Sequence, residues 1–218
     1  MPAHLRHAAG PLRAPLTAAL GSPARVAVLR VLARTGAPLT QRAVARLGGM
    51  QVRSAQLALA DLTALGLVAR IEGGRDVLVQ LNRWHHLAEP LARAFQAEGN
   101  LFLRVRERLT RLVHRQPGRK HILSVAVFGS AARGDDALGS DLDVLLVVAS
   151  QRDRDRALDA LLAAAEPFRV EFGVRLAPVC WTLAEARRGA RAGREPWPGI
   201  LRDAVTVAGP ALRDLLAL

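Results

Sequence analysis

The chain has 218 residues, of which 50% are hydrophobic and 23% charged, a composition typical of a folded globular protein and not of a disordered one. Its single cysteine, Cys180, excludes an internal disulfide and any metal site built from several cysteines. The formal net charge is +12, which favours polyanionic partners. The apolar runs are much shorter than a bilayer span, and the N-terminus lacks the compact apolar segment of a secretory signal. We therefore expect a cytoplasmic protein with no membrane partner.

The positive charge lies almost entirely in the first half of the chain. Residues 1–117 contain 17 arginines and 6 acidic residues, whereas residues 118–218 contain 14 basic and 13 acidic residues. A general preference for arginine, with Lys120 the only lysine, accounts for the basic composition but not for this asymmetry. We therefore expect a polyanion-binding module followed by a nearly neutral one.

Residues 1–16 are expected to form a loose leader, and a helical pattern begins after them. Ser22 and Pro23 are a typical N-cap and first-turn pair, and Gly36 is a typical helix stop. The apolar stripe between them consists of Val26, Leu29, Val31 and Leu32.

Two further helices and a hairpin follow in the sequence. Thr40 is expected to cap a short helix that ends at Gly48-Gly49 and buries Val44 and Leu47. The helix after it, residues 51–66, has one apolar face made of Ala55, Leu59, Leu62 and Leu65. Alternating apolar and polar residues around Gly73-Gly74 then predict a β-hairpin.

Three helices followed by a hairpin resemble the winged helix-turn-helix domains of bacterial repressors of the ArsR and MarR types, and the resemblance covers residues 17–83. It implies that the third helix enters the major groove of DNA and reads bases. The residues that would do so are Gln51, Arg53, Ser54 and Gln56, while Arg42, Arg70 and Arg75 would contact phosphates. Two alternatives stay open: the arginines only solvate a helical surface, or the domain docks another protein.

Residues 84–117 form a connecting helical segment in this interpretation, interrupted at Pro90 and again near Gly99-Asn100. Its apolar residues keep a helical spacing, which favours a homodimer formed through this segment. Those residues are Leu87, Leu91, Phe95, Leu101, Val105, Leu109, Leu112 and Val113. His85 and His86 beside Trp84 are more typical of packing than of a metal site.

The most unusual stretch is "FGSAARGDDALGSDLDVLLVV", residues 128–148. It joins an apolar run that ends at Gly129 to a second apolar run that begins with Asp141 and Asp143. Strands and helices alternate around it, which predicts an α/β or α+β domain over residues 118–218. "VRLAPVCW" is expected to be a strand interrupted by Pro178, followed by a helix with a Thr182/Glu185 capping box.

Side chains two residues apart in a strand point the same way, with their Cα atoms about 6.5 to 7 Å apart. Asp141 and Asp143 are therefore placed to hold one or two divalent cations, and Mg²⁺ accepts a few carboxylates together with phosphate oxygens. Gly129 lets the backbone approach a ligand closely. Ser130 opens a short helix whose N–H groups face anions, and Arg133 lies about one turn on and balances phosphate charge.

Phe128-Gly129-Ser130, Arg133-Gly134 and Ser140-Asp141-Leu142-Asp143 together resemble the DNA polymerase beta-like nucleotidyltransferase superfamily, and within it the minimal nucleotidyltransferases. The resemblance covers residues 118–218 and implies a mixed-sheet fold, so that the whole chain is of the α+β class. It implies that Asp141 and Asp143 bind Mg²⁺ or Mn²⁺ and that Gly129, Ser130, Arg133 and Ser140 hold a nucleoside triphosphate. A nucleoside monophosphate would then pass to a protein side chain, a small molecule or a nucleic-acid end.

The sequence departs from this family in one respect. Active members add a third carboxylate from a neighbouring strand, and "VRLAPVCW" has no acid, so Glu171 is the only near candidate for a third catalytic group. A non-catalytic transcriptional regulator, whose second domain only binds nucleotide or mediates dimerisation, therefore stays open as the alternative. Cys180 and Trp197 are expected to be packing residues.

Overall fold

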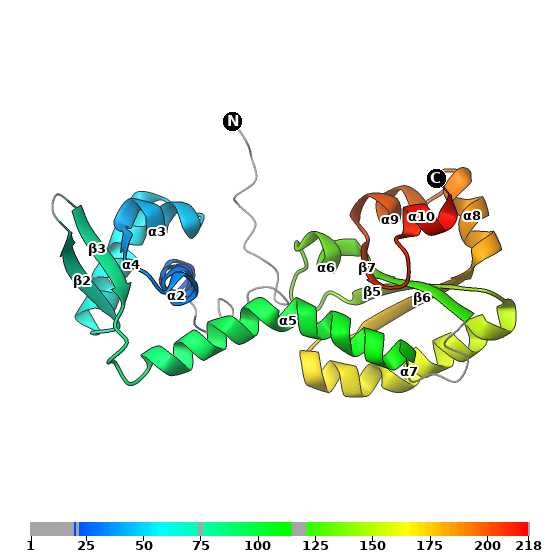
Figure 1. The fold of residues 1–218 in the computed structure, drawn as a ribbon, viewed down its shortest axis with the longest axis horizontal. Helices are drawn as coiled ribbons and strands as arrows, with labels where there is room; N and C mark the ends of the chain where they lie inside the picture. The colour runs from blue at the N-terminus through cyan, green and yellow to red at the C-terminus, as the bar shows by residue number, and fades with distance from the viewer. Residues whose placement is uncertain (1–19, 21, 74–75, 115–120, 218) are drawn as a thin grey trace. The chain divides into compact units, whose positions relative to one another are not determined.

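The computed structural model describes residues 20, 22–73, 76–114 and 121–217, and these residues divide into two compact units (Figure 1). The boundary falls between Asn100 and Leu101. We call residues 20–100 the first unit and residues 101–217 the second unit. None of the helices in the described ranges is both long and apolar enough to span a membrane.

The first unit combines helices with a small antiparallel sheet. Its elements are α2 (Pro23–Thr35), β1 (Leu39–Thr40), α3 (Gln41–Leu47), α4 (Val52–Ala64), β2 (Val68–Gly73) and β3 (Asp76–Leu81). The strand order is β1-β3-β2, and β2 pairs with β3 from Val68–Leu81 to Gly73–Asp76. The antiparallel pair predicted around Gly73 is therefore present.

The core of the first unit follows the predicted apolar stripes, except at the helix ends. The stripe of α2 is buried, as are Val44 of α3 and Ala55, Leu59 and Leu62 of α4. The burial predicted for Leu47 and Leu65 is wrong, because these side chains are 55% and 58% exposed. Leu47 is the last residue of α3 and Leu65 is the C-cap of α4, so both lie where the helix leaves the core.

The predicted N-caps of the first unit lie at the expected positions, but only one of the two makes a side-chain capping hydrogen bond. The Thr40 hydroxyl accepts a hydrogen bond from the Ala43 N–H at 3.2 Å, as an N-cap should. Ser22 is the N-cap of α2, but its side chain makes no capping hydrogen bond. Gly36 ends α2 with φ +66°, a conformation that glycine adopts without steric cost.

α5 (Ala88–His114) is one continuous helix, so the interruptions predicted at Pro90 and Gly99-Asn100 are wrong. Pro90 falls in the first turn, where the missing N–H would have had no helical partner. Phe95 is buried in the core of the first unit, whereas Val105 and Leu109 are buried in that of the second. Each unit uses its part of the apolar stripe for its own core, and the homodimer expected through this segment stays a prediction.

The second unit is built on a four-stranded mixed sheet, which confirms the α+β class. Its strands are β4 (Ile122–Val127), β5 (Leu142–Val148), β6 (Leu176–Thr182) and β7 (Val205–Ala208), in the order β6-β5-β4-β7. β5 and β6 run parallel, and the other pairs are antiparallel. The interruption predicted at Pro178 is wrong: β6 is continuous, because it is an edge strand and a proline is tolerated there.

Helices cover both faces of this sheet (Figure 1). α7 (Gln151–Phe172) and the second half of α5 contribute to the core on one face, together with Val144 and Leu146 of β5. Leu145 and Val147 pack on the other face with α8 (Leu183–Arg191), α9 (Trp197–Asp203) and α10 (Leu212–Leu216). The predicted Thr182/Glu185 capping box opens α8. Since strand residues alternate between faces, Asp143 projects to the α8–α10 side.

Candidate functional site

One short connection brings the motif residues together: β4 ends, α6 (Gly129–Arg133) follows, and a loop returns the chain to β5. The Phe128 N–H donates to the Asp143 carbonyl oxygen at 3.0 Å, which fixes the end of β4 against the start of β5. The Ser130 carbonyl accepts the N–H groups of Gly134 and Asp135 at 2.8 and 3.1 Å, which closes the turn after α6.

Gly129 and Asp143 lie in direct contact. Gly129 has φ +69°, and a Cβ atom placed on it would lie 2.2 Å from Asp143 Oδ2. No real Cβ tolerates that distance, so the position accepts only glycine while the carboxylate stays where it is. The predicted close approach at Gly129 is thus made by the chain's own aspartate, which leaves the Asp143 carboxylate against the backbone that begins α6.

Asp141 is held by an arginine from the neighbouring strand segment. Arg175 donates from Nε to Oδ1 and from Nη2 to Oδ2 of Asp141, both at 2.8 Å. The Leu142 N–H also donates to the Arg175 carbonyl oxygen at 2.8 Å, which extends the parallel β5–β6 register by one residue. Sequence reasoning missed Arg175, because the pairing depends on a strand register between residues 34 positions apart.

The two carboxyl groups differ in acidity although they are neighbours. The hydrogen bonds from Arg175 lower the pKa of Asp141 below its ordinary value. Burial raises the pKa of Asp143, the nearby Asp141 charge raises it further, and the positive charge of Arg133 opposes both effects. Asp141 is therefore the more firmly ionised of the pair, and Asp143 is the group whose charge most needs a cation.

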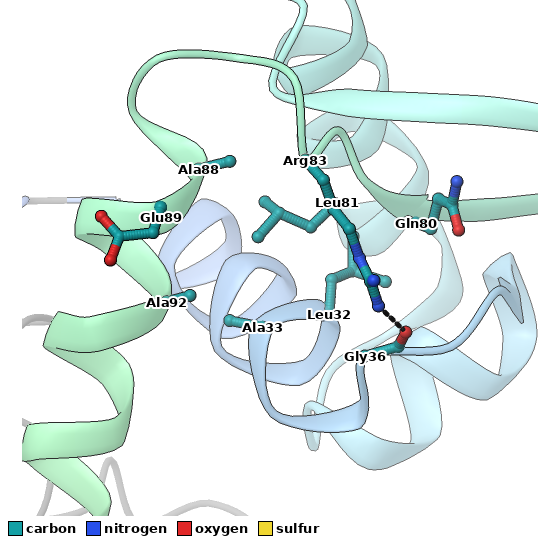
Figure 2. A pocket seen from close by; sticks show the side chains of 9 residues that line it. All are labelled: Leu32, Ala33, Gly36, Gln80, Leu81, Arg83, Ala88, Glu89 and Ala92. Carbon is teal, nitrogen blue, oxygen red and sulfur yellow. Dashed lines mark hydrogen bonds between the residues drawn. The ribbon is translucent and has the colours of Figure 1, made fainter.

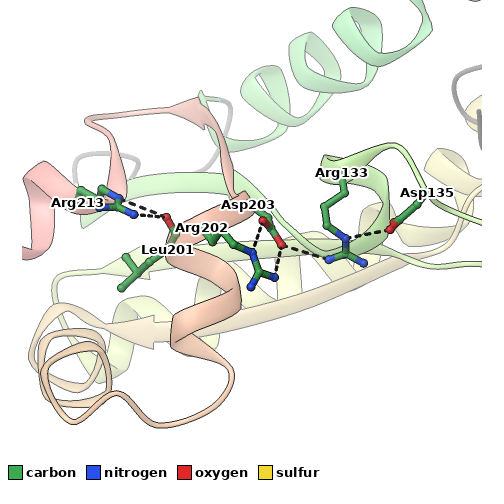
Figure 3. A network of polar contacts seen from close by, with 6 residues as sticks. All are labelled: Arg133, Asp135, Leu201, Arg202, Asp203 and Arg213. Carbon is green, nitrogen blue, oxygen red and sulfur yellow. Dashed lines mark hydrogen bonds and ion pairs between the residues drawn. The ribbon is translucent and has the colours of Figure 1, made fainter. Parts of the chain in front are cut away.

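Arg133 belongs to a polar network that joins α6 to α9 (Figure 3). Its Nε donates to Asp135 Oδ2 at 3.1 Å, and its Nη1 donates to Asp203 Oδ2 at 3.4 Å. Arg202 donates to both carboxylate oxygens of the same Asp203 at 2.8 and 2.9 Å. These acids position the guanidinium near the aspartate pair. The role of Asp203 was not predictable, since it lies 70 residues from Arg133.

The third carboxylate that the family resemblance implies does not stand opposite the pair. In the parallel register Ala177 is the partner of Asp143. Glu171 lies in α7, and its Oε2 accepts from Arg108 Nε at 2.9 Å. Among the residues that the structure describes, no group of three or more His, Cys, Asp or Glu side chains gathers as around a metal ion. The structure therefore does not bring Glu171 to the aspartate pair.

Ser140, predicted to bind nucleotide, closes the turn that precedes the pair. Its hydroxyl oxygen accepts the Ala137 N–H at 3.0 Å, and its own N–H donates to the Ala137 carbonyl at 3.0 Å. Its immediate effect is to fix the backbone just before Asp141.

The donor set of this site fits one divalent cation that is shared with a phosphate ligand. Asp141 and Asp143 offer carboxylate oxygens on one face of the sheet, and these hard ligands suit Mg²⁺ or Mn²⁺. Two carboxylates leave most of an octahedral shell to water and phosphate oxygens, as Mg²⁺ prefers when it binds with nucleotides. Asp141 and Asp143 would hold the ion, and its chemistry would be to neutralise charge on a transferring phosphoryl group.

Comparison with known families agrees with this chemistry. Residues 105–186 match the family model of the nucleotidyltransferase domain. The matched region contains Gly129, Asp141, Asp143 and Arg175, whereas Asp203 lies beyond it. The match supports nucleotidyl transfer as the general reaction class of this region.

Two solved structures resemble parts of the chain, and no curated protein matches it. One is the crystal structure of a toxin-antitoxin with AMP-PNP, at 13% identity over 51% of this chain and 80% of that chain, with a TM-score of 0.36. The other is the crystal structure of NadR in complex with 4-hydroxyphenylacetate, at 21% identity over 50% of this chain and 86% of that chain, with a TM-score of 0.33. Both TM-scores are low, and neither likeness establishes a shared fold.

Outside the nucleotidyltransferase match, the residues predicted to bind DNA lie on or beside α3, α4 and β2. Six of the seven fall in the described ranges: Arg42, Gln51, Arg53, Gln56 and Arg70 are exposed, and Ser54 is half-buried. Arg75 lies outside the described residues. Among the ion pairs of the described residues, none involves Arg42, Arg53 or Arg70, so these guanidinium groups face solvent without an internal carboxylate.

A cavity of about 340 Å³ in the first unit has a different character from the aspartate site (Figure 2). Side chains such as Leu32, Leu81 and Ala92 give it mainly apolar walls. Arg83 lies along one side and donates from Nη2 to the Gly36 carbonyl at 2.9 Å. This donor set does not suit metal-dependent phosphate chemistry.

Three side chains of the second unit serve in packing: Trp181, Trp197 and Cys180. The rings of Trp181 and Trp197 lie 4.8 Å apart, and a Cβ on Gly189 would lie 2.2 Å from Trp197 Nε1. Cys180 is buried, and its burial raises the pKa of the thiol to about 11. The thiol is therefore neutral and unreactive near neutral pH.

Proposed function

We propose that the chain is a DNA-binding protein whose second unit transfers a nucleoside monophosphate from a nucleoside triphosphate to an acceptor hydroxyl. The observation that carries this proposal is the pair Asp141 and Asp143, of which Asp143 lies against Gly129, within the region that matches the nucleotidyltransferase domain. The acceptor is a protein side chain, a small molecule or a nucleic-acid end.

In this reaction the acceptor oxygen bonds to the α-phosphorus while the bond to the bridging oxygen breaks, and pyrophosphate leaves. Asp141 and Asp143 hold the divalent cation, and Gly129 and Ser130 offer backbone to the phosphates. Arg133, fixed by Asp135 and Asp203, adds positive charge beside them. The strand partner of Asp143 is Ala177, which offers no base, and in this proposal the acceptor proton passes to solvent. Catalysis then depends on positioning and charge neutralisation.

Replacing Asp143 with asparagine tests this function directly. Asn keeps the shape of the side chain but removes the charge that holds the cation, so we expect transfer to fall about 100- to 1,000-fold, as for other groups on which a transition-state charge depends. The measurement is release of labelled pyrophosphate from each of the four nucleoside triphosphates with Mg²⁺ or Mn²⁺, in the presence of cell extract as a source of acceptor.

Asp159→Asn is the matched control, because it removes the same charge from an exposed position of α7. It should leave transfer unchanged. Equal, metal-independent pyrophosphate release by the wild type and Asp143→Asn would overturn the proposed reaction.

The DNA-binding half of the proposal is supported by the first unit alone. A short helix, a turn and α4 precede the β2–β3 pair, which is the element order of a winged helix-turn-helix, and α4 presents exposed Gln51, Arg53 and Gln56 at its N-terminal end. Helices of this kind read the major groove with their first residues. The concentration of positive charge in the first half of the chain agrees with a phosphate-rich partner.

Arg53→Ala should weaken DNA binding about tenfold, the effect of losing one good contact to a base or phosphate. Fluorescence anisotropy with a mixed-sequence duplex measures it, and affinity of the wild type should fall steeply between roughly 50 and 200 mM salt. Arg93→Ala removes the same charge from α5, where Arg93 pairs with Glu89, and should have little effect. A DNA affinity that does not change with salt, or that falls equally in both variants, would remove DNA from the proposal.

A second candidate function is a transcriptional regulator that binds nucleotide without transferring it. The specific observation in its favour is the identity of two residues beside the pair. Arg175, just before β6, binds Asp141, and Ala177 of β6 is the strand partner of Asp143, so neither position carries an acid. Metal-dependent nucleotide binding with no pyrophosphate release from any triphosphate would select this function.

A further inference from the structure

Arg175 stands where a cation would bind, at the carboxylate of Asp141. We propose that Arg175 is a switching residue, which neutralises Asp141 while the site lacks a divalent cation and moves to the phosphates when a metal–triphosphate complex binds. The inference rests on the proposed function only in that it concerns the same aspartate pair. The switch explains how a site that has a basic residue in place of a third acid can bind both a divalent cation and a triphosphate.

The contact geometry sets up a competition. Arg175 uses Nε and Nη2 to reach both carboxylate oxygens of Asp141, each at 2.8 Å. A metal ion bound by Asp141 needs one of these oxygens, and the guanidinium charge at hydrogen-bond distance repels it. A free cation therefore has to displace Arg175 before it gains full access to the pair.

The competition is weak enough to be reversed, because the pair lies near solvent. The Arg175 side chain is 71% exposed and that of Asp141 is 32% exposed. Ion pairs at such exposure contribute little, equivalent to at most about a fivefold change in an equilibrium constant. Arg175 therefore binds Asp141 while the site lacks a metal ion, and the pairing is weak enough for Arg175 to leave when a ligand binds.

A triphosphate gives the displaced guanidinium a better partner. Arginine binds phosphate with two parallel hydrogen bonds, and its charge-assisted bonds are about twice as strong as neutral ones. Arg133 is engaged by Asp135 and Asp203, so it adds charge from a fixed position, whereas Arg175 lies just before the edge strand β6. The metal and the triphosphate should therefore bind cooperatively, since each removes the obstacle to the other.

Replacing Arg175 with methionine should change the two affinities in opposite directions. Without the competing charge, Mn²⁺ alone should bind about fivefold more tightly, as measured by the loss of the free Mn²⁺ electron paramagnetic resonance signal. Without the phosphate partner, Mn²⁺–tripolyphosphate should bind about tenfold more weakly by calorimetry. Tripolyphosphate carries the phosphate chain without a base, so the result does not depend on which nucleotide is the substrate.

Arg169→Met is the matched control, because Arg169 also makes a two-point contact to a carboxylate, with Glu166, and is 56% exposed. It should change neither affinity. Arg175→Lys keeps the charge and should leave free Mn²⁺ binding close to that of the wild type.

The outcomes separate this inference from the proposed reaction. Arg175→Met affinities that stay equal to the wild type, or that both rise or both fall, overturn the switch, while metal-dependent transfer by the wild type still supports the reaction. A wild-type protein that binds neither Mn²⁺ nor Mn²⁺–tripolyphosphate overturns both.

Discussion

Gly129→Ala should lower transfer by at least about 100-fold while the protein still folds. The new methyl group would lie 2.2 Å from Asp143 Oδ2 and 3.2 Å from its Cγ, so the carboxylate has to swing away from the start of α6. A displacement of about 1 Å in a positioned catalytic group costs on the order of 100-fold in rate, and here the displaced group also holds the cation. We expect a loss of at least about 100-fold, measured as pyrophosphate release.

Gly129→Ala has two effects, backbone strain at a positive φ and the collision with Asp143, and a control variant has to separate them. Gly173, the C-cap of α7, has φ +70° against +69° for Gly129, and a Cβ there meets nothing within 4 Å. Gly173→Ala should therefore cost about 1 kcal/mol of stability and leave transfer intact. If both variants lose transfer equally, the contact between Gly129 and Asp143 is not what the reaction requires.

Glu98→Ala should destabilise the first unit by about 3 kcal/mol, the lower end of the cost of breaking a buried ion pair. The Glu98 side chain is 1% exposed and accepts from Arg30 at 2.6 and 2.9 Å and from Arg34 at 3.3 Å. This carboxylate joins α5 to α2, and removing it takes away the carboxylate partner of Arg30, whose side chain is only 19% exposed. Urea unfolding followed by far-ultraviolet circular dichroism measures the loss.

The tryptophans help to assign this effect to the first unit. Trp197 is buried in the second unit, so its fluorescence transition should stay at the wild-type urea concentration. Glu89→Ala breaks the exposed pair with Arg93 in the same helix and should cost less than about 0.5 kcal/mol. A Glu98→Ala protein as stable as Glu89→Ala would show that the buried pair contributes nothing net.

The local features of the fold were predictable from the sequence, because they depend on neighbouring residues. The α2 stripe, the Thr40 cap, the Thr182/Glu185 capping box and the strands on either side of Gly73 all follow from patterns within a few positions. The errors arose where tertiary contacts override such patterns. α5 passes through Gly99-Asn100, and there Arg34 packs against Gly99 while Glu98 binds Arg30.

For the candidate site, the sequence predicted which residues would be near one another but not what they would contact. Asp141 and Asp143 could be placed on one strand face from alternation alone. Their partners Arg175, Arg133 and Gly129 meet them through strand register and turn geometry, which a single sequence does not determine. The absence of an acid in "VRLAPVCW" was visible in advance, whereas the contact of its neighbour Arg175 with Asp141 was not.

The burial of Cys180 has a practical consequence for spectroscopy. It is the only cysteine of the chain, and with its pKa at about 11 only about one thiol in a thousand is ionised near pH 8. Maleimide and nitroxide reagents should therefore not react with Cys180, and a cysteine introduced at an exposed position would be labelled selectively. Distance measurements by fluorescence or double electron–electron resonance can thus be made on the native background, without first mutating a core residue.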